Sequence, residues 1–169
     1  MITTQIEITP YLAEYIYGKY NNGDCDEPVS IPDSEDLYYI IWDYMVKRPA
    51  NVSPVDRGNL ILKLPSRRIG KDPAVYNYLS ARAVHGIELH IRAMFNQELH
   101  SELLENDRLG HLLDNIDVVH RFLCQYCIIS ISEDALLKNY YRYRENLRQR
   151  KKRRERREKL KAVNYIGKK

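Results

Sequence analysis

Several residue types are scarce in this chain of 169 residues, and each scarcity excludes a class of protein. Three cysteines are an odd number and give no disulfide framework of the kind that stabilises small secreted domains. No apolar run approaches the roughly 18 residues of a membrane-spanning helix, and the first residues lack the basic and then apolar pattern of a signal peptide. We therefore expect a cytoplasmic protein without a membrane partner.

Catalytic and cofactor motifs are also missing from the sequence. No neighbouring nucleophile and base, no paired acidic dyad and no glycine-rich cofactor loop can be named. Glu88 and His90 are two residues apart, as are Glu98 and His100, so the two members of each pair fall on different sides of a helix. These residues and His85 are expected to be partly exposed. The sequence therefore predicts a protein that is not an enzyme and uses no cofactor or small-molecule substrate.

The cysteines offer a weak signal for a metal or redox site. Cys124 and Cys127 follow His120 on one predicted helix, but a structural zinc site needs four ligands, and Cys25 is alone in a loop. A redox pair would need its first cysteine at a helix N-terminus, whereas Cys124 comes late in its helix. We expect no metal, and we expect these cysteines to be buried as small apolar side chains.

Negative charge is nearly absent from the last fifth of the chain. Residues 138–169 contain 15 Lys and Arg but only 3 Glu, a balance of +12, whereas residues 1–137 contain 12 bases and 20 acids, a balance of −8. The formal net charge of +4 hides this division. A basic block after an acidic, apolar body is typical of a segment that binds a polyanion.

The apolar periodicity predicts a mainly α-helical protein of five or six helices around a central helix, with a minor two-stranded β element. The strands are expected at residues 2–8 and 59–64. Helices are expected from Pro10 to about Gly18, at 34–47 after an N-cap at Asp33, after Asp72, at 81–105 after an N-cap at Ser80, at 115–126, and from 132. Gly86, inside the long helix, costs about 1 kcal/mol relative to Ala unless another helix packs closely there.

The last predicted helix should bury one stripe, formed by Leu136, Tyr140, Tyr143 and Leu147. Beyond it the sequence offers almost nothing to bury. We therefore predict a helical domain with its minor β element over residues 1–149 and a basic tail over residues 150–169. That tail is either a solvated helix, helped by pairs such as Arg154 with Glu158, or disordered.

We interpret the C-terminal part as a DNA-binding region. Residues 115–126, 127–131 and 132 onward have the order of a helix–turn–helix, whose second helix would enter the major groove of duplex DNA. Arg can read guanine edges there, whereas contacts to phosphate give affinity without sequence choice. The predicted nucleic-acid-binding residues are Lys138, Tyr141, Arg142, Arg144, Arg148, Arg150, Lys151, Lys152, Arg153, Arg154, Arg156 and Arg157.

Two other functions remain open. Tyr140, Tyr141 or Tyr143 could stack on unpaired bases of an RNA. Alternatively, the protein is an interaction module whose basic tail docks an acidic partner or folds back on the acidic loop of residues 24–35. A smaller basic patch, Lys63, Arg67, Arg68 and Lys71, could hold a phosphate, although such loops are usually only solvated.

Three stretches together carry a resemblance to a known group of proteins: residues 58–65 (GNLILKLP), 71–80 (KDPAVYNYLS) and 130–144 (SISEDALLKNYYRYR). They resemble small uncharacterised, mainly helical proteins carried on bacterial mobile elements such as conjugative transposons and prophages. The likeness covers residues 34–150. It implies a compact helical domain with a central helix and a role in DNA transactions, and it implies no catalytic residues.

Overall fold

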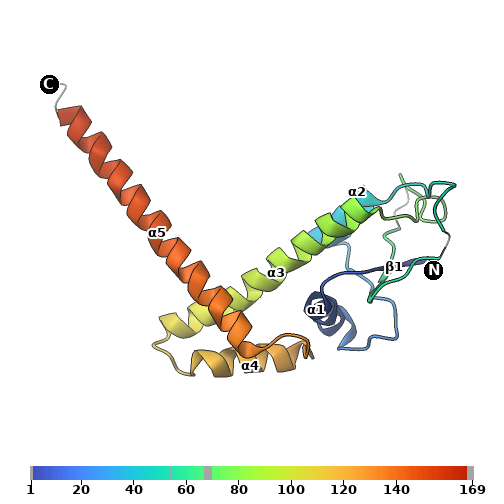
Figure 1. Cartoon of the computed structure of the whole chain (residues 1–169), viewed down its shortest axis with the longest axis horizontal. Coiled ribbons are helices and arrows are strands. Elements are labelled where there is room, and N and C mark those ends of the chain that lie inside the picture. Colours follow the sequence, from blue (N-terminus) through green and yellow to red (C-terminus); the bar gives the residue numbers. More distant parts are fainter. Residues whose placement is uncertain (1, 54, 67–69, 167–169) are drawn as a thin grey trace. The chain divides into compact units, whose positions relative to one another are not determined.

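The structure, a computed structural model, describes residues 2–53, 55–66 and 70–166, with side chains as far as residue 160. The elements follow the order β1, α1, α2, β2, α3, α4 and α5, so the fold is mainly helical with one small sheet, as the sequence predicts (Figure 1). The chain divides into two compact units, residues 1–131 and 132–169.

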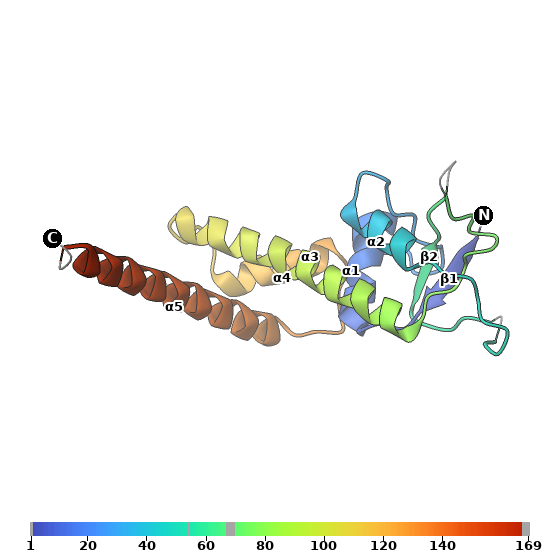
Figure 2. The same ribbon diagram turned by 90° about the horizontal axis from the view of Figure 1, so that it is seen from above.

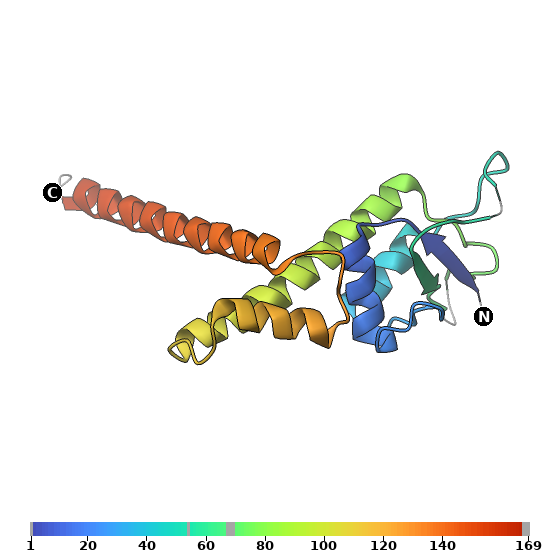
Figure 3. The ribbon, with the colours of Figure 1, turned by 60° about the horizontal axis from the view of Figure 1, so that its bottom comes forward.

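The sheet pairs the two predicted strands. β1 (Thr3–Ile6) and β2 (Leu60–Lys63) run antiparallel (Figure 3). In this register Ile6 lies opposite Leu60. Burial alternates along both strands, as expected where one face of a sheet covers a core. Beyond the strand, the Asn59 side chain accepts a hydrogen bond from the amide of Ile8 and donates one to its carbonyl, which prolongs the pairing.

Helix α1 (Pro10–Asn21) begins where the sequence predicts but ends later. Pro10 occupies the first helical position, where its missing N–H costs nothing. The helix was expected to end near Gly18, but it continues to Asn21 and closes on Asn22 in the left-handed conformation. Gly18 serves packing instead, because a Cβ there would lie 2.1 Å from the carbonyl oxygen of Tyr126.

Helix α2 (Asp36–Tyr44) is shorter than predicted at both ends. Its N-cap is Glu35 rather than Asp33, and it ends at Tyr44 because Met45 turns extended. Val46 then exchanges two backbone hydrogen bonds with Tyr78. Trp42 is buried and packs so closely on Gly70 that a Cβ there would lie 2.7 Å from the indole ring.

Helix α3 (Ala81–Arg108) is the central element of the first unit. It begins at Ser80, whose hydroxyl accepts a hydrogen bond from the amide of Ala83, and it contacts α1, α2 and α4 (Figure 2). The Tyr44 ring of α2 occupies the space that a Cβ on Gly86 would need, so a helix does pack closely there. The segment after Asp72 forms only a turn, although a helix was expected there.

The apolar face of α3 forms much of the core. Its fully buried side chains recur every four residues: Ile87, Ile91, Phe95, Leu99 and Leu103. The Phe95 ring packs edge-on against Tyr11, Tyr15 and Phe122, which joins α1 and α4 (Asn115–Gln125) to α3. These aromatic contacts and the buried aliphatic area stabilise the unit.

Several burial predictions were wrong. Cys124 and Cys127 are exposed, although they were expected to be buried, and Cys25 in its loop is exposed as well. On α4, Val119 and Phe122 face the core, and Cys124 lies about 140° from Val119 and about 160° from Phe122, because the helix turns about 100° per residue. His100, expected to be partly exposed, is buried next to Leu99.

Candidate nucleic-acid interface

Helix α5 (Glu133–Ile166) forms the basic end of the chain as one continuous helix of 34 residues. The Ser132 hydroxyl accepts a hydrogen bond from the amide of Ala135, and Glu133 and Asp134 lie in the first turn, where the helix dipole favours acids. At about 1.5 Å per residue the helix is about 50 Å long. Of the two states expected for the tail, residues 150–166 have the helical one.

The predicted buried stripe of α5 is correct only for its first half. Leu136 and Tyr140 are buried, and Tyr143 is half-buried, but Leu147 is exposed. Tyr140 also makes a cation–π contact, because the Arg144 guanidinium lies 5.7 Å from the centre of its ring. Burial is therefore confined to the first turns of α5, and the rest of the helix has to be stable without it.

The predicted binding residues are all in α5, and all but one are exposed. Arg144 is half-buried, and the exposed ones are Lys138, Tyr141, Arg142, Arg148, Arg150, Lys151, Lys152, Arg153, Arg154, Arg156 and Arg157. Because successive residues are about 100° apart, the bases at 150–157 surround the helix instead of forming one face. A helix that is polar on every side buries no face, so it is surrounded either by solvent or by a ligand of opposite charge.

The glutamates of α5 offset only a small part of this charge. Glu145 lies 3.9 Å from Arg148 and accepts a hydrogen bond from Gln149, and Arg154 pairs with Glu158 at 2.9 Å, as predicted. Residues 138–160 hold 12 bases against 3 acids, a balance of +9. Such exposed pairs contribute only a few tenths of a kcal/mol each, so repulsion between like charges remains along the helix.

The segment between α4 and α5 is held in place by contacts that the sequence did not indicate. One oxygen of Glu14, in α1, accepts hydrogen bonds from the amides of Ile129 and Ser130 and from the Ser130 hydroxyl, at 2.8–3.0 Å. Cys127 adopts φ 55°, the left-handed conformation that a turn glycine usually provides. No sequence spacing could relate Glu14 to Ser130, because they are 116 residues apart.

The boundaries of α4 and α5 agree with the residues expected for the two helices of a helix–turn–helix. The turn between them has no glycine, and Cys127 provides the left-handed residue. The helix–turn–helix itself stays a prediction, and so does a domain boundary at residue 149.

The smaller basic patch is used within the fold. The Lys71 ammonium donates to the carbonyl oxygens of Trp42 and Asp43, at the C-terminal end of α2, where a cation is favoured. Lys63 is half-buried on β2, and Arg67 and Arg68 lie outside the described residues. Lys71 therefore stabilises a helix end, which leaves less positive charge for a phosphate.

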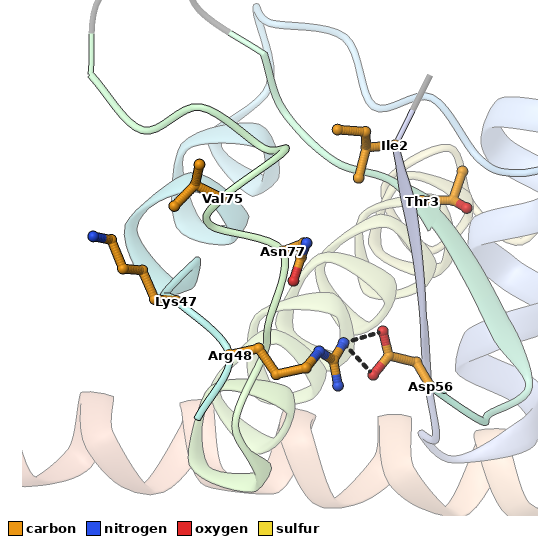
Figure 4. A pocket seen from close by; sticks show the side chains of 7 residues that line it. All are labelled: Ile2, Thr3, Lys47, Arg48, Asp56, Val75 and Asn77. Carbon is orange, nitrogen blue, oxygen red and sulfur yellow. Dashed lines mark hydrogen bonds and ion pairs between the residues drawn. The ribbon is translucent and has the colours of Figure 1, made fainter. Parts of the chain in front are cut away.

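A hollow lined by the cationic side chains of Lys47 and Arg48 lies beside the sheet (Figure 4). This cavity of about 490 Å³ contains Arg48, whose guanidinium binds both carboxylate oxygens of Asp56 at 2.7 Å and lies 5.1 Å from the centre of the Tyr78 ring. Thr4 donates a third hydrogen bond to Asp56, and Arg48 also donates to the Ser53 carbonyl. The arrangement neutralises its own charge and ties the 48–56 loop to β1.

Further kinds of site are not found within the described parts of the chain. There, no three His, Cys, Asp or Glu side chains come together in a way that could hold a metal ion. None of the described helices combines the length and the apolar character required to cross a membrane. The exposed basic surface of α5 is thus the most distinct candidate interface. No protein-family model, curated protein or solved structure matches this chain.

Proposed function

We propose that this protein is a non-enzymatic DNA-binding protein and that α5 supplies its binding surface. The observation that carries the proposal is the exposed basic helix, in which residues 138–160 have a balance of +9 and nothing apolar on most of their length. An exposed helix that repels itself is stabilised when phosphates neutralise it. Duplex DNA presents such charges densely, one for each ~1.7 Å of its axis.

The dimensions of α5 suit the major groove. A helix with side chains is about 10–12 Å across, and the major groove is about 12 Å wide with phosphates along both edges. Lys and Arg side chains on every side of the helix can then reach the floor and both edges of the groove. We propose that Tyr141, Arg142 and Arg144 contact nucleobases and that the Lys and Arg residues at 150–157 contact phosphates.

The finer biological role is also a proposal. The order and boundaries of α4 and α5 are compatible with a helix–turn–helix regulator, and the resemblance to proteins of bacterial mobile elements favours a regulator or accessory factor of such an element. Both statements depend on the α5 surface binding DNA, so that binding is tested first.

The test is binding of the full chain to a fluorescent DNA duplex, followed by anisotropy over a salt series. If α5 neutralises about six phosphates, the affinity should fall about a thousandfold between about 50 and 200 mM salt. Arg153→Gln with Arg156→Gln should lower the slope of log K against log salt by about 1.8. The matched control, Arg57→Gln with Arg82→Gln, removes two exposed cations from the other unit and should leave the slope unchanged.

The same assay with single-stranded DNA and hairpin RNA separates the alternatives. Tyr141 is half-exposed, and its ring is available for stacking on an unpaired base. Tighter binding of the RNA than of the duplex, lost in Tyr141→Ala, would replace the DNA proposal with an RNA one. An absence of binding at about 50 mM salt would leave an acidic protein as the partner of α5.

A further inference from the structure

The residues that precede α5 bring two cysteines together from distant parts of the sequence. Gly18 and Glu14 of α1 hold the backbone of residues 126–130, as described above. This docking places Cys127, the C-terminal neighbour of α4, beside the loop that follows α1, which contains Cys25. Both cysteines belong to the first compact unit.

The two thiols flank one residue, Gly23. The Cys127 sulfur lies 3.0 Å from the position that a Cβ on Gly23 would occupy, and the Cys25 sulfur lies 3.5 Å from the Gly23 carbonyl oxygen. Gly23 has φ 84°, and a larger residue would both strain the backbone and displace Cys127. Gly23 thus leaves room for the thiols to approach each other.

Both thiols are also exposed to solvent, so a small reagent can reach them. Cys124 is exposed as well, but its sulfur contacts Nε2 of His120 at 3.6 Å, one turn back along α4. The arrangement therefore favours Cys25 over Cys124 as the partner of Cys127.

We propose that Cys25 and Cys127 form a reversible disulfide by exchange with a low-molecular-weight disulfide such as oxidised glutathione. The Cys127 thiolate attacks one sulfur of glutathione disulfide, forms a mixed disulfide and releases one glutathione thiolate. The Cys25 thiolate then attacks the Cys127 sulfur of the mixed disulfide and releases the second. Two protein thiols are oxidised, one glutathione disulfide is reduced, and the two protons that the protein thiols lose are taken up, through solvent, by the two glutathione thiolates.

The charges around Cys25 support this order of attack. Desolvation, followed by the nearby carboxylates of Asp24, Asp26 and Glu14, raises the pKa of the Cys25 thiol. A thiol with a raised pKa is less often ionised, which disfavours it as the first attacker in solution. The neighbouring Cys127 also raises the pKa of Cys25, in keeping with the closeness of the two groups.

The experiment incubates the full chain with oxidised glutathione and about 0.1 mM reduced glutathione, blocks free thiols, and maps cross-linked peptides by mass spectrometry. Chymotryptic cleavage after Tyr126 gives Cys124 and Cys127 different peptides, so each possible pair has its own mass. We expect the Cys25–Cys127 peptide pair in about tenfold excess over the mixed disulfide, since adjacent thiols have effective concentrations in the millimolar range.

Matched variants make the result decisive. Cys124→Ser should keep the cross-link, and Cys25→Ser and Cys127→Ser should each replace it with glutathione bound to the other member of the pair. Unchanged far-ultraviolet circular dichroism would show that each variant is folded. A Cys124–Cys127 cross-link, or glutathione on all three cysteines without a protein disulfide, would overturn the proposal. Neither outcome depends on DNA binding.

Discussion

Tyr126 connects three helices of the first unit. Its hydroxyl donates a hydrogen bond of 3.0 Å to Glu98 of α3, and its ring packs edge-on against Tyr15 of α1 and Phe122 of α4. Burial, and then the negative charge of Glu98, raises the pKa of Tyr126 to about 12. The same two causes, burial first, raise the pKa of Tyr15.

These shifts predict a loss of stability at alkaline pH. A phenol whose pKa is higher in the folded state stabilises the fold fully below the unfolded value of about 10. That contribution is lost as the pH rises from about 10 through the folded value of about 12. The free energy of unfolding, measured with urea, should fall less between pH 8 and pH 11 for Tyr126→Phe than for the natural chain. Tyr141→Phe, at a half-exposed position, is the control and should not change the difference.

At the residue scale, the cysteines show where reading the sequence failed. Cys124 and Cys127 were treated as small apolar side chains, which are usually buried. The helical spacing of α4 would have corrected this, because it places Cys124 on the side opposite the buried Val119 and Phe122. The approach of Cys25 to Cys127 could not be found in this way, since it depends on how the loop after α1 folds back.

At the scale of elements, α5 differs from the other helices in what stabilises it. α3 buries a stripe on every turn from Ile87 to Leu103, whereas α5 has no buried side chain between Tyr143 and Leu160. Helical stability in proteins comes mostly from packing of an apolar face. The second half of α5 therefore depends on backbone hydrogen bonds and a few surface ion pairs.

This difference predicts unequal hydrogen exchange. Amides of residues 148–158 should exchange close to the rate of an unfolded chain, and those of residues 87–103 should be protected up to the stability of the whole unit. Exchange followed by mass spectrometry at neutral pH checks both, with α3 as the internal reference. Adding a DNA duplex should slow exchange in residues 148–158 and leave residues 87–103 unchanged; protection of residues 148–158 without DNA would contradict the expectation.

The elements themselves could largely be predicted from the sequence. Alternation located β1 and β2 to within two residues, and Ser80 and the acids of Ser132–Asp134 marked the starts of α3 and α5. The ends of α1 and α2 were less predictable, because each is decided by contacts with distant residues. Gly18 is needed where the Tyr126 backbone packs on α1, so it does not mark the end of that helix. The pairing of Val46 with Tyr78 ends α2 early.

At the scale of the whole molecule, the two units carry opposite charge. Residues 1–131 contain 12 bases and 18 acids, a balance of −6, and residues 132–169 contain 15 bases and 5 acids, a balance of +10. Different copies of the chain should therefore attract one another at low ionic strength, where charges are screened over about 30 Å instead of 8 Å.

Sedimentation velocity over a salt series checks this expectation. The average mass should be higher at about 10 mM than at about 150 mM salt. Arg153→Gln with Arg156→Gln should weaken the association at low salt. Arg57→Gln with Arg82→Gln should not weaken it, because these changes make the acidic unit more acidic. A mass independent of salt would show that the charge division has no effect between molecules.

The position of Trp42 has a consequence for how unfolding of this protein is observed. It is the only tryptophan, it is buried in α2, and it packs on Gly70. Its fluorescence thus reports on residues 1–131 alone, whereas ellipticity at 222 nm also counts α5, which holds about a third of the helical residues. The two signals should give different midpoints, a lack of coincidence that reflects two units melting separately and not an intermediate of one.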